Sequence, residues 1–412
     1  MGRKINVLVV PSDKFGCGLY RSVSPHTYLD KLYGSEFDVE IEYQPNYSDL
    51  ESFNKYDIIH IHKGLYQNME PFWAFIDYCK SHDITTVLDL DDNWEVGPQH
   101  PLYLTNKQGH VAEKIIENVK KFDYVTTTTS IFANKIKKFN KNVLVFPNAI
   151  DPSEEQYQPI KNPSSKLRFG FVMGSAHEKD MEQFKGVVNA LPKDILDKIQ
   201  IVLCGYDLRG VMTVLNPDGS VQGQRPIKPT ESVWYSYEKT VTDNYNICSP
   251  EYKEFLMKFL KDVQWPMVDN EHYRREWTRD VNDFAMHYRN IDVLFAPLDC
   301  NPFNEVKSEL KFIEAGFTKT ALICTDFGPY TLISKSLFKK GGEIDEEGNC
   351  ILVEPEKKHK AWGQAIKKLV NNPQYIDILK NNLYNTVKDK YDINNVTADR
   401  AKWYKEITKK KV

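Results

Sequence analysis

The sequence predicts an α/β fold made of two doubly wound, Rossmann-like domains. Short apolar runs, such as residues 4–11 and 167–174, are typical of strands buried in a parallel sheet. Helical patterns alternate with these runs, as repeated βα units require. A polar stretch at 152–166 has no periodicity and separates two such series, which indicates a linker between domains.

The bulk composition is that of an ordinary globular protein. The chain has 412 residues, enough for two separate cores, and is 41% hydrophobic and 27% charged. A formal net charge of −3 gives no general attraction to nucleic acid, although a local basic face is compatible with it. The seven cysteines have no CxxC spacing, which favours reduced cysteines in a cytoplasmic protein. No apolar run reaches ~18 residues, so we expect neither a signal peptide nor a transmembrane helix. Peripheral membrane contact and oligomeric state stay open.

The N-terminal domain is predicted to span 1–155. After the strand at 4–11, a glycine-containing loop at 15–21 leads into a helix that continues to about residue 32. Gly16 and Gly18 allow either a tight turn or close approach of the backbone to a ligand, but they do not form the GxGxxG dinucleotide motif. Arg21 follows this loop and is a candidate for contact with phosphate. Further strands are expected at 37–41, 56–62, 85–92, 124–130 and 142–148, with helices at about 71–81, 110–122 and 131–139.

The C-terminal domain is predicted to span 166–390. A helix is expected at 179–190, and strands at 167–174, 199–205, 292–297, 320–325 and 350–353. An insertion at about 206–287 is rich in aromatic residues and arginine. We expect it to contain short helices, because a loop of that length without structure is unusual. It is either a small hydrophobic subdomain or a surface that stacks sugars or bases. Residues 391–412 are predicted to form a lysine-rich helix. Its lysines either form a solvated face, or the helix packs back toward the N-terminal domain.

The segment NEVKSELKFIEAG, residues 304–316, is predicted to be one helix that follows the buried strand at 291–298. A helix in this place directs its N-terminal N–H groups toward the crevice where open α/β sheets bind ligands. Lys307 and Ser308 in its first turn suit a phosphate, and Glu314 suits a sugar hydroxyl. The structural alternative is a surface helix with charges at i, i+4 spacing.

Several motifs together resemble those of the retaining GT-B glycosyltransferases of family 4. FPNAID at 146–151 resembles the element that closes the first domain of these enzymes, and KSELKFIEAG at 307–316 resembles their KSxLKxxEAG motif. DFGPY at 326–330 resembles the turn after the following strand. GSAHEKD at 174–180 resembles the loop that clamps the donor pyrophosphate.

The resemblance implies a GT-B fold, with two Rossmann-like domains facing each other across a cleft. It also implies transfer of a sugar from a UDP- or GDP-sugar to an acceptor hydroxyl, with retention and without a metal or other cofactor. Glu314 matches the carboxylate that binds the donor ribose, and Lys307 and Ser308 match residues near the diphosphate. The family motif has another carboxylate eight positions before the one that Glu314 matches, and this sequence has Val306 at that position. The remaining donor-binding candidates are His177, Lys179, Asn304, Glu305 and Lys311, together with Gly16, Gly18 and Arg21.

Catalytic candidates lie at the ends of two N-terminal strands. One interpretation of Asp89, Asp91 and Asp92 is a DxD metal–nucleotide site of the GT-A type. In the other, Asp91 and Asp92 stand where retaining GT-B enzymes carry a His-Asp pair, and Asp91 contacts the sugar or acts as a base. A capping role is the structural alternative. His62 is a candidate for contact with acceptor or sugar; a zinc pair of His60 and His62 lacks a third ligand.

The sequence therefore predicts a glycosyltransferase. The expected acceptor is a glycan or lipid-linked saccharide, or a hydroxymethylated DNA base, for which the arginine-containing insertion is the reason. A nucleotide-sugar 2-epimerase and a non-catalytic sugar-nucleotide or glycan-binding protein are the alternatives.

Overall fold

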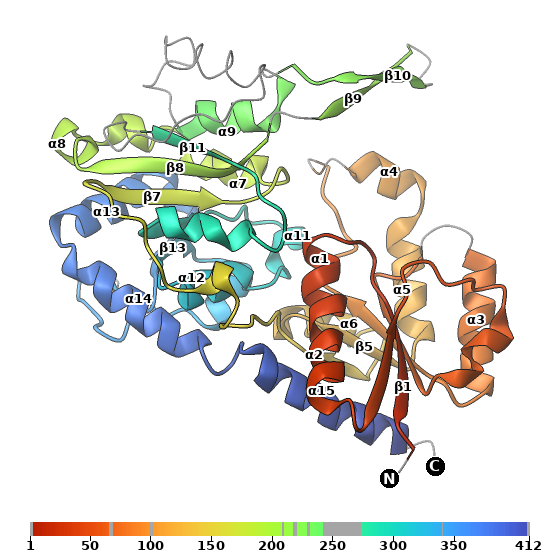
Figure 1. Ribbon diagram of the computed structural model, residues 1–412. Coiled ribbons are helices and arrows are strands. Elements are labelled where there is room, and N and C mark those ends of the chain that lie inside the picture. The colour runs from red at the N-terminus through yellow and green to blue at the C-terminus, as the bar shows by residue number, and fades with distance from the viewer. Residues whose placement is uncertain are drawn as a thin grey trace. The chain divides into compact units, whose positions relative to one another are not determined.

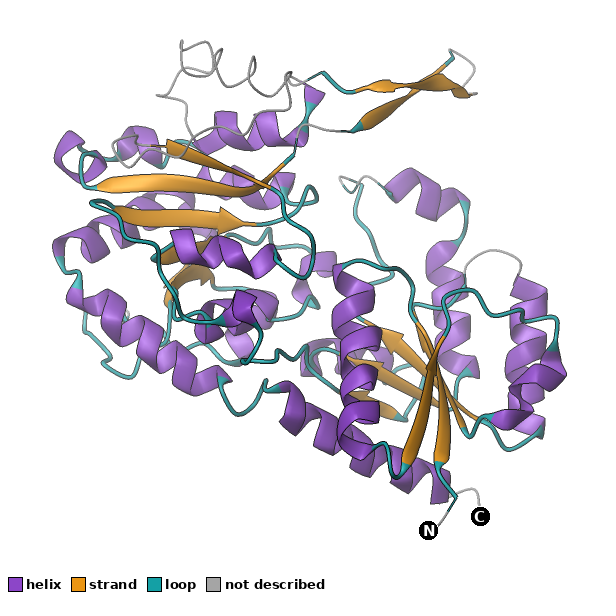
Figure 2. Ribbon diagram, in the orientation of Figure 1, coloured by secondary structure: helices purple, strands orange, loops and turns teal. Residues whose placement is uncertain are grey.

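The computed structural model describes residues 3–65, 69–98, 100, 102–207, 210–216, 221–228, 231–241, 273–339 and 341–409 (Figure 1). Its contacts divide the chain into two units. Unit 1 comprises Met1–Pro152, Cys300–Ile313 and Val387–Val412, and unit 2 comprises Ser153–Asp299 and Glu314–Thr386. Each unit contains a six-stranded sheet with helices on both faces (Figure 2). The predicted α/β fold of two Rossmann-like units is confirmed.

The sheet of unit 1 is parallel throughout, with strand order β2-β1-β3-β4-β5-β6. Its strands are β1 (Ile5–Val10), β2 (Phe37–Ile41), β3 (Ile58–His62), β4 (Thr85–Leu90), β5 (Tyr124–Thr127) and β6 (Val143–Val145). Its helices are α1 (Gly16–Gly18), η1 (Leu19–Val23), α2 (Ser24–Tyr33), η2 (Leu50–Lys55), α3 (Met69–Ser81), α4 (Tyr103–Gln108), α5 (Val111–Lys121), α6 (Ser130–Ile136), α11 (Pro302–Glu305) and α15 (Ile393–Lys409).

Alternate residues of β1 pack into two different cores, as a strand covered on both faces requires. Val7 and Val9 belong to a core with residues of α2 and α15, which lie side by side in Figure 1. Leu8 and Val10 belong to a second core with residues of α3, α5 and α6. The C-terminal helix α15 is therefore part of unit 1, where its residues Trp403 and Tyr404 are buried.

The sheet of unit 2 is also parallel, with strand order β11-β8-β7-β12-β13-β14. Its strands are β7 (Leu167–Val172), β8 (Ile199–Tyr206), β11 (Tyr273–Trp277), β12 (Val293–Ala296), β13 (Ala321–Thr325) and β14 (Ile351–Val353), and a separate hairpin is formed by β9 (Val211–Leu215) and β10 (Val221–Pro226). Its helices are η3 (Glu155–Tyr157), α7 (Glu178–Met181), η4 (Glu182–Phe184), η5 (Val188–Ala190), α8 (Lys193–Leu196), α9 (Val233–Val241), η7 (Phe284–Asn290), η8 (Gly328–Leu332), η9 (Pro355–Lys357), α13 (Lys358–Asn371) and α14 (Gln374–Val387), with α12 (Leu310–Phe317) at the boundary between the units.

Both strand orders reverse direction at one point. In unit 1, β2 lies on one side of β1, and β3 to β6 follow one another on the other side of β1. In unit 2 the corresponding break lies between β7 and β12. Ligands of open α/β sheets bind beyond the carboxyl ends of strands at such a switch point, so each unit has a defined place for a site.

The prediction of one continuous helix at 304–316 is wrong. The structure has two helices there, α11 and α12. Val306 ends α11 and is buried at 1% exposure in a core of unit 1. Glu309 is also buried and accepts a hydrogen bond from the hydroxyl of Tyr391 at 2.7 Å. These buried contacts outweigh the helical pattern, so Lys307 and Ser308 lie between two helices and not in the first turn of one.

The described part of the predicted insertion is only partly helical. It contains the hairpin β9–β10 and helix α9, and β11 joins the main sheet as its edge strand beside β8. The rest of this prediction, which includes Tyr245 and Trp265, falls on residues 242–272, outside the described residues. The interpretation of the whole insertion as a stacking surface or a subdomain therefore remains a prediction.

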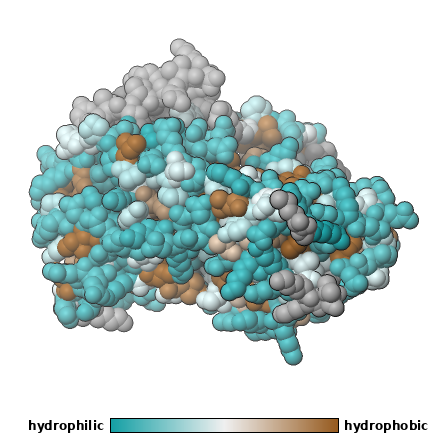
Figure 3. Space-filling model, turned by 60° about the horizontal axis from the view of Figure 1, so that its bottom comes forward, coloured by the Kyte–Doolittle hydropathy of each residue, from teal (hydrophilic) through white to brown (hydrophobic). Residues whose placement is uncertain are grey.

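The molecular surface is described from one side in Figure 3. This face is mainly hydrophilic, and its hydrophobic residues occur in small separate groups, as is normal for a solvated surface. Among the described residues, no helix is both long enough and apolar enough to span a membrane. The cysteines at 17, 79, 204, 300, 324 and 350 are free thiols.

Candidate active site

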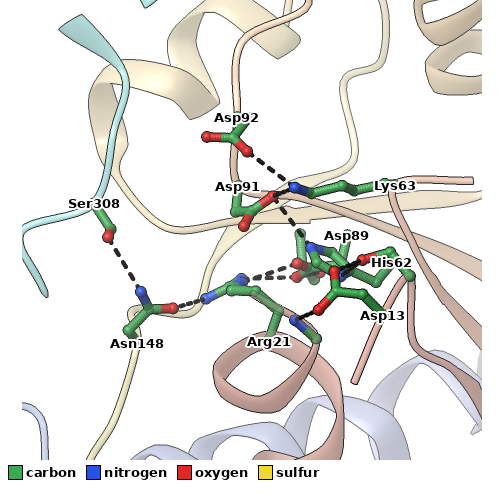
Figure 4. A network of polar contacts seen from close by, with 12 residues as sticks. Asp13, Arg21, His62, Lys63, Asp89, Asp91, Asp92, Asn148 and Ser308 are labelled. Atoms are coloured by element: carbon green, nitrogen blue, oxygen red, sulfur yellow. Dashed lines mark hydrogen bonds and ion pairs between the residues drawn. The ribbon is translucent and has the colours of Figure 1, made fainter. Parts of the chain in front are cut away.

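Polar side chains in unit 1 gather at the carboxyl ends of β1, β3 and β4 (Figure 4). Ser12 and Asp13 follow β1, His62 ends β3, and Asp91 follows β4. Because the strands are parallel, these ends meet at one edge of the sheet, at the switch point between β1 and β3. The site predicted from the strand ends of His62 and Asp91 is thus assembled in one place.

Both ring nitrogens of His62 face oxygen atoms. Nδ1 lies 2.9 Å from Ser12 Oγ, and Nε2 lies 3.1 Å from Asp91 Oδ1. The Ser12 hydroxyl donates its one hydrogen to Asp13 at 2.6 Å, so it accepts from His62. Asp91 in its ionised form also accepts. Both ring nitrogens of His62 are thus held by oxygen atoms of the same network.

Lys63 places a cation at this edge. Its ammonium lies 2.9 Å from Asp92 Oδ2 and 3.3 Å from Asp91 Oδ1. Burial raises the pKa of the Asp91 carboxyl, but the charges of His62 and Lys63 outweigh burial and hold that pKa well below its usual range. Burial similarly lowers the pKa of Lys63, and the two aspartates outweigh it and raise the pKa. Asp91 is therefore a stable carboxylate beside His62 and Lys63.

Arg21, predicted as a candidate for phosphate contact, is buried and paired inside unit 1. Its guanidinium makes a bidentate pair with Asp89 and donates to the Phe146 carbonyl at 2.7 Å and to Asn148 Oδ1 at 3.1 Å. Only 1% of the residue is exposed. Burial raises the pKa of Asp89, but the charge of Arg21 outweighs it and lowers that pKa. Asp89 also accepts from Thr126, so its carboxylate is not presented to a metal as the DxD interpretation required.

Gly18 has a structural requirement that Gly16 lacks. The backbone N–H groups of Phe15 and Gly18 donate to Asp13 Oδ1 at 2.8 and 3.2 Å. A Cβ atom on Gly18 would come within 2.0 Å of the Asp13 carbonyl oxygen, whereas a Cβ on Gly16 would meet nothing within 4 Å. The loop thus holds Asp13, which in turn orients Ser12 and His62.

The segment between α11 and α12 contacts the same network. The side-chain amide of Asn148 donates to Ser308 Oγ at 3.1 Å and connects Ser308 to Arg21 (Figure 4). The ammonium of Lys307 lies 5.4 Å from the centre of the Phe303 ring. Sequence reasoning missed Asn148, Lys63, Ser12 and Asp13 as site residues. Their position directly after a strand was the available signal.

In unit 2 the polar groups lie at the switch point between β7 and β12. His177, in the loop after β7, lies 2.7 Å from Asp180 Oδ2 through its Nδ1. Asp180 is buried and also accepts from the backbone N–H of Asp299, which follows β12, at 2.7 Å. The His177 side chain is 28% exposed, so its other edge can meet a ligand. Lys179 is exposed and pairs with Glu182, one turn along the surface.

Glu314 is buried at 2% exposure in unit 2 and accepts a hydrogen bond from the hydroxyl of Tyr288 at 2.8 Å. Burial, followed by the nearby carboxylate, raises the pKa of Tyr288 well above its usual value, so the phenol remains a donor. By contacts Glu314 belongs to unit 2, whereas Asn304, Glu305, Lys307, Ser308 and Lys311 belong to unit 1. Asn304 is buried and Glu305 is exposed.

One group of side chains at the unit 1 site has donor atoms suited to a metal ion, namely Cys17, Asp91 and Asp92. The ammonium of Lys63 lies against both carboxylates and already supplies a positive charge there. The residues therefore fit a lysine cation better than a metal ion.

The structure is similar over nearly its full length to several solved structures. A sucrose-phosphate synthase from Thermosynechococcus elongatus is 14% identical, with a TM-score of 0.60 and coverage of 99% of this chain and 100% of that chain. HepE from Anabaena, in complex with UDP-glucose, is 10% identical, with a TM-score of 0.59 and coverage of 98% and 99%. An alpha-glucosyltransferase in complex with UDP and a DNA 13-mer containing an HMU base is 10% identical, with a TM-score of 0.56 and coverage of 99% and 100%.

These similarities establish the fold. The chain has the GT-B fold of two Rossmann-like units, as predicted from the sequence. No protein-family profile matches the sequence, and no curated protein is significantly similar to it.

Proposed function

We propose that the protein is a glycosyltransferase that moves a sugar from a UDP- or GDP-sugar to an acceptor hydroxyl. The observation that carries this proposal is the Asp91 carboxylate, fixed by His62 and Lys63 at the switch point of unit 1. The GT-B fold supports the proposal, because solved structures of that fold include one with UDP-glucose bound. Of the two candidate donors, a UDP-sugar is favoured over a GDP-sugar, because similar structures contain UDP-glucose or UDP.

The donor nucleotide is assigned to unit 2. Glu314, oriented by Tyr288, is proposed to accept hydrogen bonds from the ribose hydroxyls. His177, oriented by Asp180 beside the end of β12, is proposed to contact the diphosphate. Lys179 remains a weaker candidate for the diphosphate, because breaking its exposed pair with Glu182 has a small cost. Lys307 and Ser308 are retained as further candidates for phosphate contact.

Asp91 is proposed to bind the transferred sugar and not to act as a base. A carboxylate whose pKa is held well below its usual range is a poor proton acceptor at neutral pH. Its side chain is 10% exposed, which leaves an oxygen edge for a sugar hydroxyl. Asp92, at 38% exposure, is the better placed of the two for an acceptor. Negative charge near the anomeric carbon also stabilises an oxocarbenium-like transition state.

Retention without a metal is part of the proposal. Departure of the diphosphate develops negative charge, which cationic side chains can stabilise in a preorganised site. His177 and Lys179 are the side chains of unit 2 proposed for this purpose. In a retaining transfer the acceptor approaches from the side of the leaving group, so a phosphate oxygen can take the acceptor proton.

The proposed acceptor is a carbohydrate hydroxyl. A hydroxymethylated DNA base is the second candidate, and the observation that favours it is the similarity to the alpha-glucosyltransferase in complex with DNA. The net charge of −3 weighs against DNA. Epimerisation of the donor, or binding without turnover, are the competing functions for the same site.

Release of nucleotide diphosphate tests the proposal. Purified protein is incubated with UDP- and GDP-sugars in the presence of a saccharide panel or of hydroxymethylated DNA, and products are identified by mass spectrometry. We expect slow donor hydrolysis alone and faster release with one acceptor class. A donor converted to its 2-epimer, or a donor that binds without any turnover, would contradict glycosyl transfer. Loss of turnover with unchanged donor affinity in Asp91→Asn would separate the sugar site from the nucleotide site.

A further inference from the structure

Three potential metal ligands from separate elements meet in the interior of unit 2. Cys204 lies on β8, Glu276 on β11, and His287 on η7. Cys204 and Glu276 are partners in the register of the two strands. All three residues are buried, with exposures of 0%, 5% and 0%, and their ligand atoms lie within 4.8 Å of one another. The fold itself therefore brings a sulfur, an oxygen and a nitrogen to one point.

Part of this cluster is satisfied internally. Nδ1 of His287 lies 2.8 Å from Glu276 Oε2, and the Cys204 thiol lies within 4.8 Å of the ligand atoms of both residues. His287 Nε2 and Glu276 Oε1 are buried and have no hydrogen-bond partner. A buried polar atom without a partner destabilises the folded state, so two in one cluster point to a ligand.

We propose that Cys204, Glu276 and His287 bind a divalent metal ion of the zinc class. Thiolate, imidazole and carboxylate are the ligands that zinc takes in proteins, whereas calcium and magnesium prefer oxygen ligands alone. Binding converts the thiol to a thiolate: the S–H bond is broken, an S–metal bond forms, and the proton leaves to solvent. The thiolate and the carboxylate together balance the two positive charges of the ion.

Two cations, Arg274 and Arg279, act on the cluster, and a bound ion must compete with them. Arg274 Nε lies 4.0 Å from Glu276 Oε1 and competes for that carboxylate. Burial, and then the charge of Glu276, raise the pKa of the Cys204 thiol well above its usual value. Metal binding therefore requires loss of the thiol proton.

The location suggests what the ion does. His287 is next to Tyr288 on η7, and Tyr288 donates to Glu314. An ion held by β8, β11 and η7 would fix η7 against the sheet and so hold Tyr288 in place. Its role is positional, and its existence does not depend on the proposed glycosyl transfer.

Metal content and cobalt spectroscopy test the site on the full-length protein. Protein stripped with a chelator is loaded with Zn²⁺ or Co²⁺, desalted and measured for bound metal. We expect one equivalent per chain, a thiolate-to-cobalt charge-transfer band, release of a proton on binding, and a rise in the melting temperature. Cys204→Ala and His287→Gln should abolish the band. Cys324→Ala is the matched control, a buried cysteine of the same sheet, and should retain it.

Two results would overturn the proposal. One is wild-type protein that retains no metal after loading, a result that needs no variant to fold. The other is a charge-transfer band that does not follow Cys204. The band would then persist in Cys204→Ala or disappear in Cys324→Ala, and either outcome would place the thiolate elsewhere. Donor turnover is measured in parallel, so that a failed metal site and a failed transferase assignment are told apart.

Discussion

Arg21 and Asp89 form a bidentate ion pair in the interior of unit 1, with hydrogen bonds of 2.9 and 2.7 Å. Neither side chain is exposed by more than 1%. The pair joins η1, which follows the glycine loop, to β4, which leads to Asp91. Arg21 thereby sets the position of the candidate site without touching a ligand itself.

Removing one partner of this pair should strongly destabilise unit 1. Arg21→Met or Asp89→Leu leaves a buried charge alone, at a cost of about 3–5 kcal/mol, whereas the double variant loses less than the sum of the two. Chemical denaturation of the three variants measures this coupling. Arg3→Met, in the exposed pair with Asp57, is the control and should cost under ~1 kcal/mol. Additive losses in the double variant would show that the pair contributes no coupling.

Gly18→Ala should disrupt the loop that holds Asp13. The new Cβ would lie 2.0 Å from the Asp13 carbonyl oxygen, so the backbone must move, with a typical overpacking cost of about 1–3 kcal/mol. Gly16→Ala adds the same atom into open space and is the matched control. Melting temperatures distinguish the two variants. Equal melting temperatures for both would mean that the loop rearranges freely.

The strands and their order of appearance were predictable because buried parallel strands are continuous apolar runs with polar residues at their ends. The division of helix 304–316 was not, since its cause is tertiary. Val306 is drawn into the core of unit 1, and Glu309 pairs with Tyr391, about eighty residues later. Helical periodicity records neither contact.

The site was predicted in part for the same reason. His62 and Asp91 end or follow strands, so their meeting could be inferred from topology. Lys63 is adjacent to His62, but nothing in the sequence says that its ammonium lies between two aspartates. Arg21 was interpreted as a candidate for phosphate contact because it follows the loop of Gly16 and Gly18. Its partner Asp89 is 68 positions away, and only the fold brings them together.

Asp91→Asn should reduce transfer more than Asp92→Asn. The amide lacks the charge that faces the sugar, and groups that stabilise transition-state charge contribute about 10²–10³ in kcat. Asp92 is more exposed, at 38% against 10% for Asp91, and should contribute less. Steady-state kinetics with the donor and acceptor that the product assay finds measure the two effects. An Asp91→Asn enzyme with normal kcat would remove Asp91 from the sugar site.

Lys161 lies in the polar linker at 152–166, and its side chain is partly buried in unit 2. Its ammonium donates to the carbonyls of Tyr288 and Ile291, each at 2.8 Å, and to Thr320 Oγ1 at 2.5 Å. Burial lowers the pKa of Lys161 from 10.5 to about 7. The residue therefore ties the linker to η7 and β13 while carrying a charge that burial disfavours.

This pKa predicts a specific dependence of stability on pH. Between the folded pKa of about 7 and the unfolded value of 10.5, the unfolded chain binds more protons, so stability rises with pH across that window. Below pH 7 both states are protonated, and this contribution levels off at its lowest value. For one proton, the free energy of unfolding changes by at most about 1.4 kcal/mol per pH unit. Denaturation of wild type and Lys161→Met from pH 6 to 9.5 measures the difference. The wild type should gain on Lys161→Met as the pH rises. Lys193→Met, at an exposed lysine of the same unit, is the control, and its free energy of unfolding should differ from that of the wild type by the same amount at every pH. The same constant difference for Lys161→Met would show that Lys161 remains fully charged in the folded protein.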